Sequence, residues 1–379
     1  MTTAMLDRRA LEDLKIAVLA AGVRLTDEAR SLIAGMSGGI LSIHEYPTTG
    51  GVTLELEDGV YINAPFDGPF DGVSGHLLSA EGGVLRIEGP DASFDVVRVL
   101  PLPGYLGQLD DEGDRVDEVA MSHADRVRLS PIVGCAYRCR FCDLGAMDYV
   151  RRGSVRLLHA LDVACSDAAL PPRHALISGG SPRRAQYDEF ITTCEEVIRA
   201  SPVLVDVMFS PMIDRLDIVD RLVDAGAAGF AINLELYSEA ASRSELGAKF
   251  LTSRKHFEAT VQRAVERLGR TGRVRSLIIP GLEPIEETLH GVEYLASLGC
   301  DPVLSPFRPA EGTELVDHAP PPPGLLRDVL DESRRIVASH GVSLGPDCVP
   351  CQHNTLTFPW DVREIPHVPS EPPDGVGRL

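Results

Sequence analysis

The sequence predicts an α/β protein built as a full or partial (β/α) barrel of the TIM type, with a small α+β domain at its N-terminus. From residue 126 onward, short apolar runs alternate with longer helical patterns, as in repeated strand–helix–strand units of a parallel sheet. These units extend over about 220 residues, which is close to the length that such a barrel needs. Residues 1–115 follow a different pattern, with two helices before a series of short strands.

Composition and charge narrow the possible functions. The 379 residues are 44% hydrophobic and 24% charged, the balance of an ordinary soluble globular protein. No run approaches the ~18 apolar residues of a membrane span, and no secretory signal is found, so we expect a cytoplasmic protein without a membrane partner. The chain has 36 basic and 56 acidic residues and a net charge of −20. Such a surface repels phosphate backbones and disfavours nucleic acid as a partner.

Residues 1–115 are expected to form an α+β domain that caps the barrel or recognises a substrate or partner. Amphipathic patterns predict helices at Leu11–Ala21 and Thr26–Ala34. Alternating patterns predict strands within 50–56 and 84–88. The acidic segment Asp110–Asp117 is expected to be a linker between this domain and the barrel.

The barrel is expected to occupy residues 126–345. Its predicted strands are Arg126–Val133, Ala175–Ser178, Val203–Phe209, Gly229–Leu236, Val274–Ile279 and Val303–Phe307. Its predicted helices are Val155–Ala169, Tyr187–Ala200, Arg215–Asp224, Ser253–Gly269, Ile285–Leu298 and, after a linker at Pro320–Pro323, Leu325–Ser339. Residues 346–379 form a C-terminal extension, whose Pro- and Gly-rich tail from Pro366 is expected to be disordered.

Three cysteines follow the first predicted strand of the barrel. Cys135, Cys139 and Cys142 have the spacing C-x3-C-x2-C. Zinc sites usually combine two separated pairs of ligands, and electron-transfer 4Fe–4S clusters take four thiolates. Three thiolates on one loop, with no fourth nearby, therefore predict a cluster in which one iron stays open to a substrate or cofactor.

This loop resembles that of the radical S-adenosylmethionine superfamily, in its biotin-synthase-like barrel type, with Phe141 in the aromatic position of the motif. The resemblance implies a 4Fe–4S cluster held by Cys135, Cys139 and Cys142 as the catalytic and metal-binding residues. Its open iron would chelate S-adenosylmethionine, and one electron would cleave that cofactor to a 5′-deoxyadenosyl radical, which takes a hydrogen atom from a substrate. The resemblance also implies an electron donor of the flavodoxin or ferredoxin type. A small organic substrate and a biosynthetic step, such as a rearrangement or carbon–carbon bond formation, are expected.

By the same resemblance, residues at the ends of later strands would bind S-adenosylmethionine. They are Tyr137 and Phe141 in the loop, Gly179, Gly180 and Ser181 for the methionine amino group, Asn233 and Glu235 for the ribose, Arg254 (preferred to Lys249 and Lys255) for the methionine carboxylate, and Ile279 and Gly281 against the adenine. Asn233 and Glu235 share one side of a strand, where buried polar groups need partners. Ordinary turns, a polar strand end and a solvated helix face are the structural alternatives.

Substrate contacts are predicted at Asp206, Arg308 and His353. Asp206 could equally face the helices, and Arg308 could be a solvated rim residue. Cys348 and Cys351, at x2 spacing and with His353 nearby, could hold part of an auxiliary iron–sulfur cluster or a zinc ion. A structural turn, or a thiol that donates a hydrogen atom to a product radical, is the alternative for these two cysteines.

Two other functions stay open. The protein could modify a peptide that its N-terminal domain binds, or it could be a non-catalytic iron–sulfur or zinc protein. The first alternative predicts a peptide substrate, and the second predicts no cleavage of S-adenosylmethionine.

Overall fold

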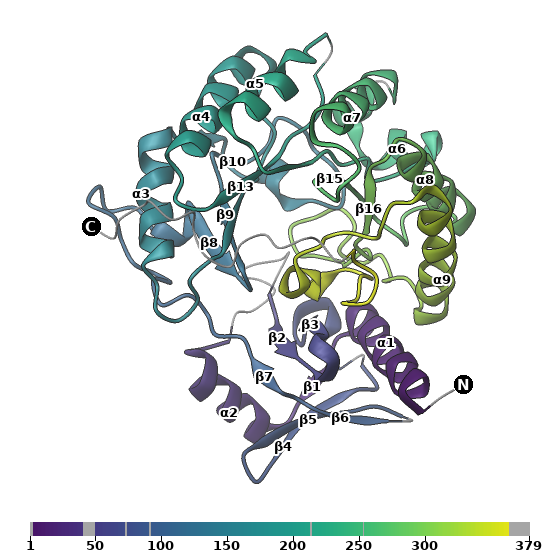
Figure 1. Ribbon diagram of the computed structural model, residues 1–379. Coiled ribbons are helices and arrows are strands. Elements are labelled where there is room, and N and C mark those ends of the chain that lie inside the picture. The colour runs from purple at the N-terminus through teal and green to yellow at the C-terminus, as the bar shows by residue number, and fades with distance from the viewer. Residues whose placement is uncertain are drawn as a thin grey trace.

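The computed structural model describes residues 3–363, apart from 41–49, 73, 91, 213 and 253. The predicted disordered tail from Pro366 lies outside the described residues. In the described part of the chain, the central sheet has seven strands in the order β16-β15-β14-β13-β12-β9-β8 (Figure 1). These strands are β8 (Ala120–His123), β9 (Arg126–Leu129), β12 (His174–Ile177), β13 (Leu204–Met208), β14 (Gly229–Ala231), β15 (Val274–Ile278) and β16 (Asp301–Leu304).

The sheet is an open, partial barrel. All neighbouring strands run parallel except β8, which pairs antiparallel with β9. No pairing joins β16 to β8 among the described residues, so the two edge strands do not close the ring. The predicted α/β barrel is therefore confirmed in its partial form.

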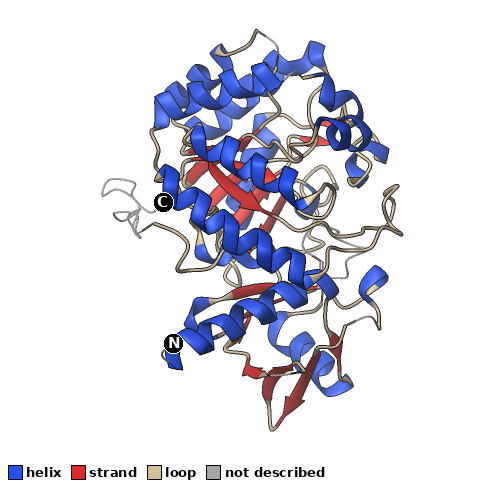
Figure 2. Ribbon diagram, turned by 90° about the vertical axis from the view of Figure 1, so that its right-hand side faces the viewer, coloured by secondary structure: helices blue, strands red, loops and turns tan. Residues whose placement is uncertain are grey.

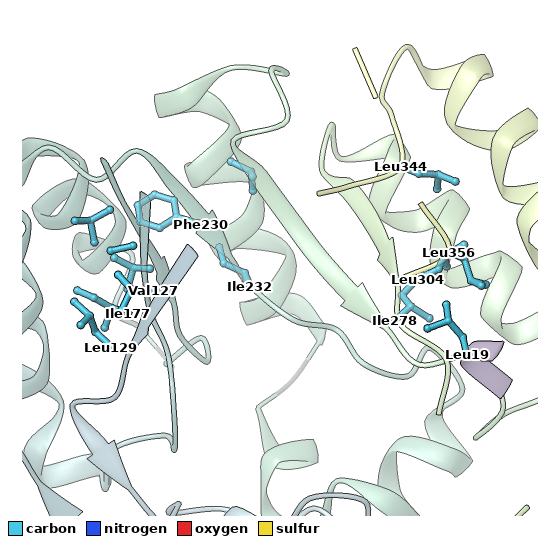
Figure 3. Close-up of a cluster of buried hydrophobic side chains, with 14 of the residues drawn as sticks. Leu19, Val127, Leu129, Ile177, Phe230, Ile232, Ile278, Leu304, Leu344 and Leu356 are labelled. Atoms are coloured by element: carbon cyan, nitrogen blue, oxygen red, sulfur yellow. The ribbon is translucent and has the colours of Figure 1, made fainter. Parts of the chain in front are cut away.

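Helices cover the outer face of the sheet (Figures 1 and 2). They are α3 (Ser154–Cys165), α4 (Tyr187–Ala200), α5 (Asp217–Ala225), α6 (Glu239–Glu245), α7 (Arg254–Leu268), α8 (Ile285–Ser297) and α9 (Pro323–His340). Alternate strand residues, such as Val127, Ile177 and Phe230, are fully buried toward these helices (Figure 3). The other alternate positions face the barrel interior, where the strands carry polar side chains. No described helix is both long and apolar enough to cross a membrane.

The N-terminal segment contains two helices and two small sheets. The helices are α1 (Thr3–Ala21) and α2 (Asp27–Ser37). One sheet has the order β3-β2-β7, with β2 (Val52–Glu55), β3 (Tyr61–Ala64) and β7 (Arg98–Val99). The other has the order β1-β4-β5-β6, with β1 (Arg24–Leu25), β4 (Leu77–Glu81), β5 (Val84–Glu88) and β6 (Ser93–Asp95). Thr26 caps α2 because its side chain accepts a hydrogen bond from the Ala29 amide. Gly38 has φ 76° and ends that helix.

The β2–β3 hairpin bridges the two edges of the open barrel. Thr53 of β2 is 3.1 Å from His123 of edge strand β8, and the Asn63 amide of β3 donates to Thr53. Arg308, which follows the other edge strand β16, donates to the side-chain and backbone oxygens of Asn63 at 2.7 and 3.0 Å. We call this row of four residues the hairpin bridge.

The C-terminal segment returns beneath the barrel and meets α1. Helix α1 packs along α9, and its fully buried Lys15 donates to the carbonyls of Gln352 and Thr357 at 2.9 and 2.7 Å. The Leu356 amide donates to the Leu304 carbonyl of β16 at 2.8 Å. Leu19 of α1 belongs to the same buried cluster as Leu304 and Leu356 (Figure 3). One core therefore joins the first helix, the barrel and the C-terminal segment.

The structure corrects two predicted strands. The predicted strand Arg126–Val133 stops at Leu129, because Pro131 has no N–H for the ladder. Residues Ile132–Val133 form β10, which pairs antiparallel with β11 (Val150–Arg151). The predicted strand Gly229–Leu236 pairs continuously only to Ala231.

The predicted linker at 110–117 is also wrong in part. Val116 and Asp117 are buried, and Asp117 accepts from the Gly107 amide. The segment thus folds back on itself and leads directly into β8, which the sequence patterns did not indicate.

Candidate active site

The cysteine loop lies beyond the carboxyl end of β9, directly after β10. Cys135, Cys139 and Cys142 are free and half-buried. The Cys142 amide donates to the Cys139 carbonyl at 3.1 Å, and the short 3-10 helix Asp143–Ala146 then begins. In α/β barrels this end of the strands is where active sites are built.

The end of β12 packs directly against this loop. A Cβ at Gly180 would overlap the carbonyl oxygen of Gly134, so only glycine fits at position 180. The Ala136 amide donates to the Ser181 carbonyl at 3.0 Å. In return, the Ser181 amide donates to Cys135 Sγ at 3.2 Å. The structure therefore brings Gly180 and Ser181 to the loop, as predicted.

Arg140 fixes the other side of the loop. Its amide donates to the carbonyl of Glu245, the last residue of α6, and its own carbonyl accepts from the Glu314 amide. Its guanidinium pairs with Glu245 at 3.2 Å and with Glu314 at 2.9 Å. Phe141 packs against the buried cluster that contains Leu236 and Ile279. Backbone and side-chain contacts on two sides thus hold the loop in one shape.

The surroundings of the three thiols suit a bound cation. Burial raises the pKa of Cys139 to about 12 and that of Cys142 to about 11. Such thiols ionise at neutral pH only when a cation binds them.

A buried ion pair lies beside the loop. Lys249 Nζ is 2.6 Å from Glu235 Oε1, and both side chains are largely buried. Burial pulls the pKa of Lys249 down, but the charges of Glu235 and Cys139 outweigh it and raise the pKa above its ordinary value. Glu235 has φ 68°, an unusual backbone for a residue other than glycine, and its buried Oε2 has no partner in the described part of the chain.

Arg254, which was preferred as the cation near the cofactor, lies beside two tyrosines. It donates a hydrogen bond to the Tyr237 carbonyl, and its guanidinium lies 4.1 Å from the ring centre of Tyr237 and 5.7 Å from that of Tyr294. Within the described residues, no hydrogen bond or ion pair joins Arg254 to the cysteine loop. Lys249, the less favoured residue, is the cation whose charge reaches the loop cysteines.

Asn233 is tied to the neighbouring strand. Its Oδ1 accepts from the Leu277 amide at 3.2 Å, and its Nδ2 is 3.6 Å from Met208 Sδ. These contacts fill the interruption in the backbone pairing with β15, which resumes at Glu235. Glu235 then takes a left-handed conformation. The simple alternation that the sequence analysis assumed therefore does not relate these two side chains.

The remaining predicted cofactor positions lie around the same end of the barrel. Ile279 is buried in the cluster that Phe141 joins. Gly179 and Gly281 have φ 142° and 108°, and a Cβ at Gly281 would lie 2.9 Å from the Pro321 ring. Tyr137 lines a cavity of about 380 Å³ beside the loop. Arg183, Tyr187, Met212 and Leu251 also line it, and sequence patterns gave no sign of them.

Two predicted substrate residues are already engaged by protein partners. Asp206 faces the interior, not the helices, and forms a buried ion pair with Arg275. Burial raises the pKa of Asp206, but Arg275 outweighs it and holds the pKa below its ordinary value. Arg308 belongs to the hairpin bridge and is not a solvated rim residue, and burial lowers its pKa to about 10.

His353 differs from the other two predicted substrate residues. Its ring centre lies 4.3 Å from that of His123, and its Nδ1 is 2.8 Å from the Pro350 carbonyl. Its buried Nε2 has no hydrogen-bond partner among the described residues. A polar atom of a ligand could still use this nitrogen.

Cys348 and Cys351 lie at the opposite end of β12 from the cysteine loop. They are joined by a disulfide bond on the 3-10 helix Val349–Asn354. His174, the first residue of β12, places its Nε2 3.4 Å from Cys348 Sγ and 3.3 Å from Cys351 Sγ. Burial lowers the pKa of His174 to about 4. The sequence analysis missed His174, because a lone histidine at the start of a strand carries no motif.

Comparisons with known proteins find structural likeness only. No family model and no curated protein match the chain. Solved structures that match include the FeFe-hydrogenase maturase HydG from Carboxydothermus hydrogenoformans, at 15% identity and a TM-score of 0.46, over 62% of this chain and 58% of that one. Methylornithine synthase (PylB) matches at 15% identity and a TM-score of 0.44, over 63% of this chain and 71% of that one.

A third match is coproporphyrinogen III oxidase (HemN) from Escherichia coli, whose description calls it a radical SAM enzyme. It matches at 18% identity and a TM-score of 0.40, over 63% of this chain and 58% of that one. The chain thus spans less than two thirds of the length of HydG and of HemN.

Proposed function

We propose that the protein is a radical S-adenosylmethionine enzyme that acts on a small organic molecule. One observation carries the proposal: a C-x3-C-x2-C loop with three free cysteines stands at the carboxyl end of an open βα barrel. Gly180 and Arg140 hold this loop in place.

Cys135, Cys139 and Cys142 would hold a 4Fe–4S cluster. When bound, the cluster would supply an open iron for S-adenosylmethionine and the electron that cleaves it to a hydrogen-abstracting 5′-deoxyadenosyl radical. The Ser181 amide, 3.2 Å from Cys135 Sγ, stabilises the negative charge of that thiolate.

Lys249 supplies a positive charge for the carboxylate of an amino acid group, and Glu235 supplies a negative charge for its amine. Lys249 Nζ is placed to donate to a carboxylate, and the unpartnered Oε2 of Glu235 is placed to accept from an amine or a hydroxyl. Both groups are largely buried, so their interactions with a charged ligand are stronger than in water. This pair is the proposed binding point for the methionine end or the ribose of the cofactor.

A small substrate is favoured over a peptide. The hairpin bridge links the two edges of the open barrel through residues of the N-terminal segment. The cavity of about 380 Å³ beside the loop has the volume of ordinary small-molecule sites. We further propose a cytoplasmic enzyme of biosynthesis that receives its electron from a flavodoxin- or ferredoxin-type protein.

The proposal is tested by anaerobic reconstitution with iron and sulfide. The wild type should become brown and form 5′-deoxyadenosine when given a strong reductant. Cys135→Ala, Cys139→Ala and Cys142→Ala should each lose the iron and the product, whereas Cys165→Ser, on helix α3, should keep both. Iron-free wild-type protein, or product from the alanine variants, would overturn the proposal. Iron without product would support the non-catalytic alternative.

A further inference from the structure

Three potential metal ligands converge at the end of the barrel opposite the cysteine loop, and they come from two segments that are far apart in the sequence. His174 begins β12, while Cys348 and Cys351 lie on the turn that follows α9. Their ligand atoms all lie within 4.8 Å of one another. The Cys351 amide donates to the Cys348 carbonyl at 2.9 Å, and the two Cα atoms are 5.2 Å apart. The backbone thus presents both sulfurs to the same imidazole nitrogen.

These distances match one particular geometry. Zinc binds sulfur at about 2.3 Å and imidazole nitrogen at about 2.0–2.1 Å, so a tetrahedral site separates the nitrogen from each sulfur by about 3.5 Å. His174 Nε2 is already 3.4 and 3.3 Å from the two sulfurs. Only the sulfurs must move apart, to about 3.8 Å, which rotation of the two cysteine side chains can provide.

We propose that His174, Cys348 and Cys351 form a zinc site when the two cysteines are reduced. On binding, each thiol gives up its proton, so that Zn²⁺ is held by two thiolates and one neutral imidazole, and two protons are released. The fourth position is left to a water molecule. The disulfide seen here is the two-electron oxidised form of the same sulfurs. A phosphine reverses it by giving two electrons and becoming the phosphine oxide, while water supplies the oxygen and two protons.

The geometry favours one zinc ion over an auxiliary iron–sulfur cluster. Clusters are ordinarily held by four cysteine thiolates, whereas this site offers two thiolates and one imidazole, close enough to share a single ion.

The site would fasten the C-terminal segment to the start of β12. Gly179 and Gly180 follow the other end of this strand, about 17–20 Å from His174 at about 3.3 Å per residue. Zinc removal should therefore affect the anchoring of residues 345–358 rather than the cysteine loop. The proposal does not depend on the chemistry of that loop.

The experiment measures zinc and iron together in the full-length protein. The chain is reduced with a phosphine under anaerobic conditions, mixed with equimolar Zn²⁺, and freed of unbound metal by gel filtration. We expect about one zinc per wild-type chain and at least a tenfold weaker affinity in His174→Ala. His174→Cys, which restores a ligand, should recover binding, and His159→Ala, at an exposed histidine, should bind as the wild type does.

Cobalt provides a second readout that does not depend on stability. In the Cys135→Ala/Cys139→Ala/Cys142→Ala background, which lacks the loop thiols, Co²⁺ should give the visible bands of a tetrahedral thiolate site, and His174→Cys should shift them. Absence of zinc from the reduced wild type, or equal zinc affinity in His174→Ala, would overturn the proposal. Loss of iron from Cys348→Ser/Cys351→Ser would also overturn it, in favour of an iron cluster. A zinc site could be confirmed even if the cysteine loop proved to bind nothing.

Discussion

Lys249 and Glu235 form a buried ion pair in which each charge depends on the other. Lys249→Met should leave the Glu235 carboxylate buried without its partner, which costs about 3–5 kcal/mol of unfolding free energy. It should also remove most formation of 5′-deoxyadenosine, because the cofactor loses its cation. Urea unfolding and product analysis of the reconstituted enzyme measure the two effects.

Matched variants separate the two effects. Lys249→Met/Glu235→Gln should recover part of the stability but not the activity. Arg254→Met, which removes a cation stacked on Tyr237, should keep most of the activity. If Arg254→Met abolished cleavage and Lys249→Met did not, the assignment of the cation would be reversed.

The sequence analysis preferred Arg254 to Lys249, although both follow the fourth barrel strand. Their surroundings favour Lys249. The 3-10 helix Gly247–Leu251 carries Lys249 to Glu235, while Arg254 stands at the start of α7 beside two tyrosines. His174 was missed for a related reason: its partners lie 174 and 177 residues away. A local motif such as C-x3-C-x2-C is visible in a sequence, but a site assembled from distant segments is not.

Strand β12 supports the cysteine loop through the glycine at its end. Gly180→Ala should displace the loop, because the added methyl group would overlap the Gly134 carbonyl. We expect loss of most reconstituted iron, even though the three cysteines remain. Gly35→Ala, in the last turn of α2, is the control: nothing lies near its added methyl group, so the iron content should stay that of the wild type. Full iron content in Gly180→Ala would contradict the packing described here.

Most helices and strands could be predicted from their apolar periodicity. The predicted helix Tyr187–Ala200 coincides with α4, and Ile285–Leu298 differs from α8 by one residue. The errors fall where side chains or turns replace regular pairing. The β14 ladder ends where Ser276 Oγ and Asn233 Oδ1 take over backbone hydrogen bonds. Such replacements depend on the neighbouring strand and leave no periodic signal.

Lys15 connects the first helix to the C-terminal segment through its buried hydrogen bonds. Burial lowers the pKa of this lysine to about 7, from an ordinary value of 10.5. Between these two pH values the unfolded chain binds more protons at this residue than the folded chain does, so stability rises with pH. From pH 7 to pH 9 the gain should be about 2 kcal/mol.

Lys15→Met should remove this part of the pH dependence. Urea unfolding at pH 7, 8 and 9 would show a flatter curve for the variant than for the wild type. Lys255→Met, a change at an exposed lysine, should leave the slope unchanged. A variant with the slope of the wild type would show that Lys15 does not titrate between the two states in this range.

The barrel itself followed from the sequence, but the way in which the N-terminal segment joins it did not. The sequence predicted a separate domain at residues 1–115, and the division of the chain into domains stays a prediction. The contacts that connect this segment to the rest, such as Lys15 with Gln352 and Asn63 with Arg308, join residues 245 to 337 positions apart. A pattern of residues within a short stretch of sequence does not predict such contacts.

The hairpin bridge has a practical consequence for engineering. Thr53 and Asn63 join the two edges of the barrel from a part of the chain that does not carry the cysteine loop. A library of variants restricted to β2 and β3 would change this part of the barrel wall while leaving the residues of that loop unchanged. The wall and the loop could then be varied independently in one polypeptide.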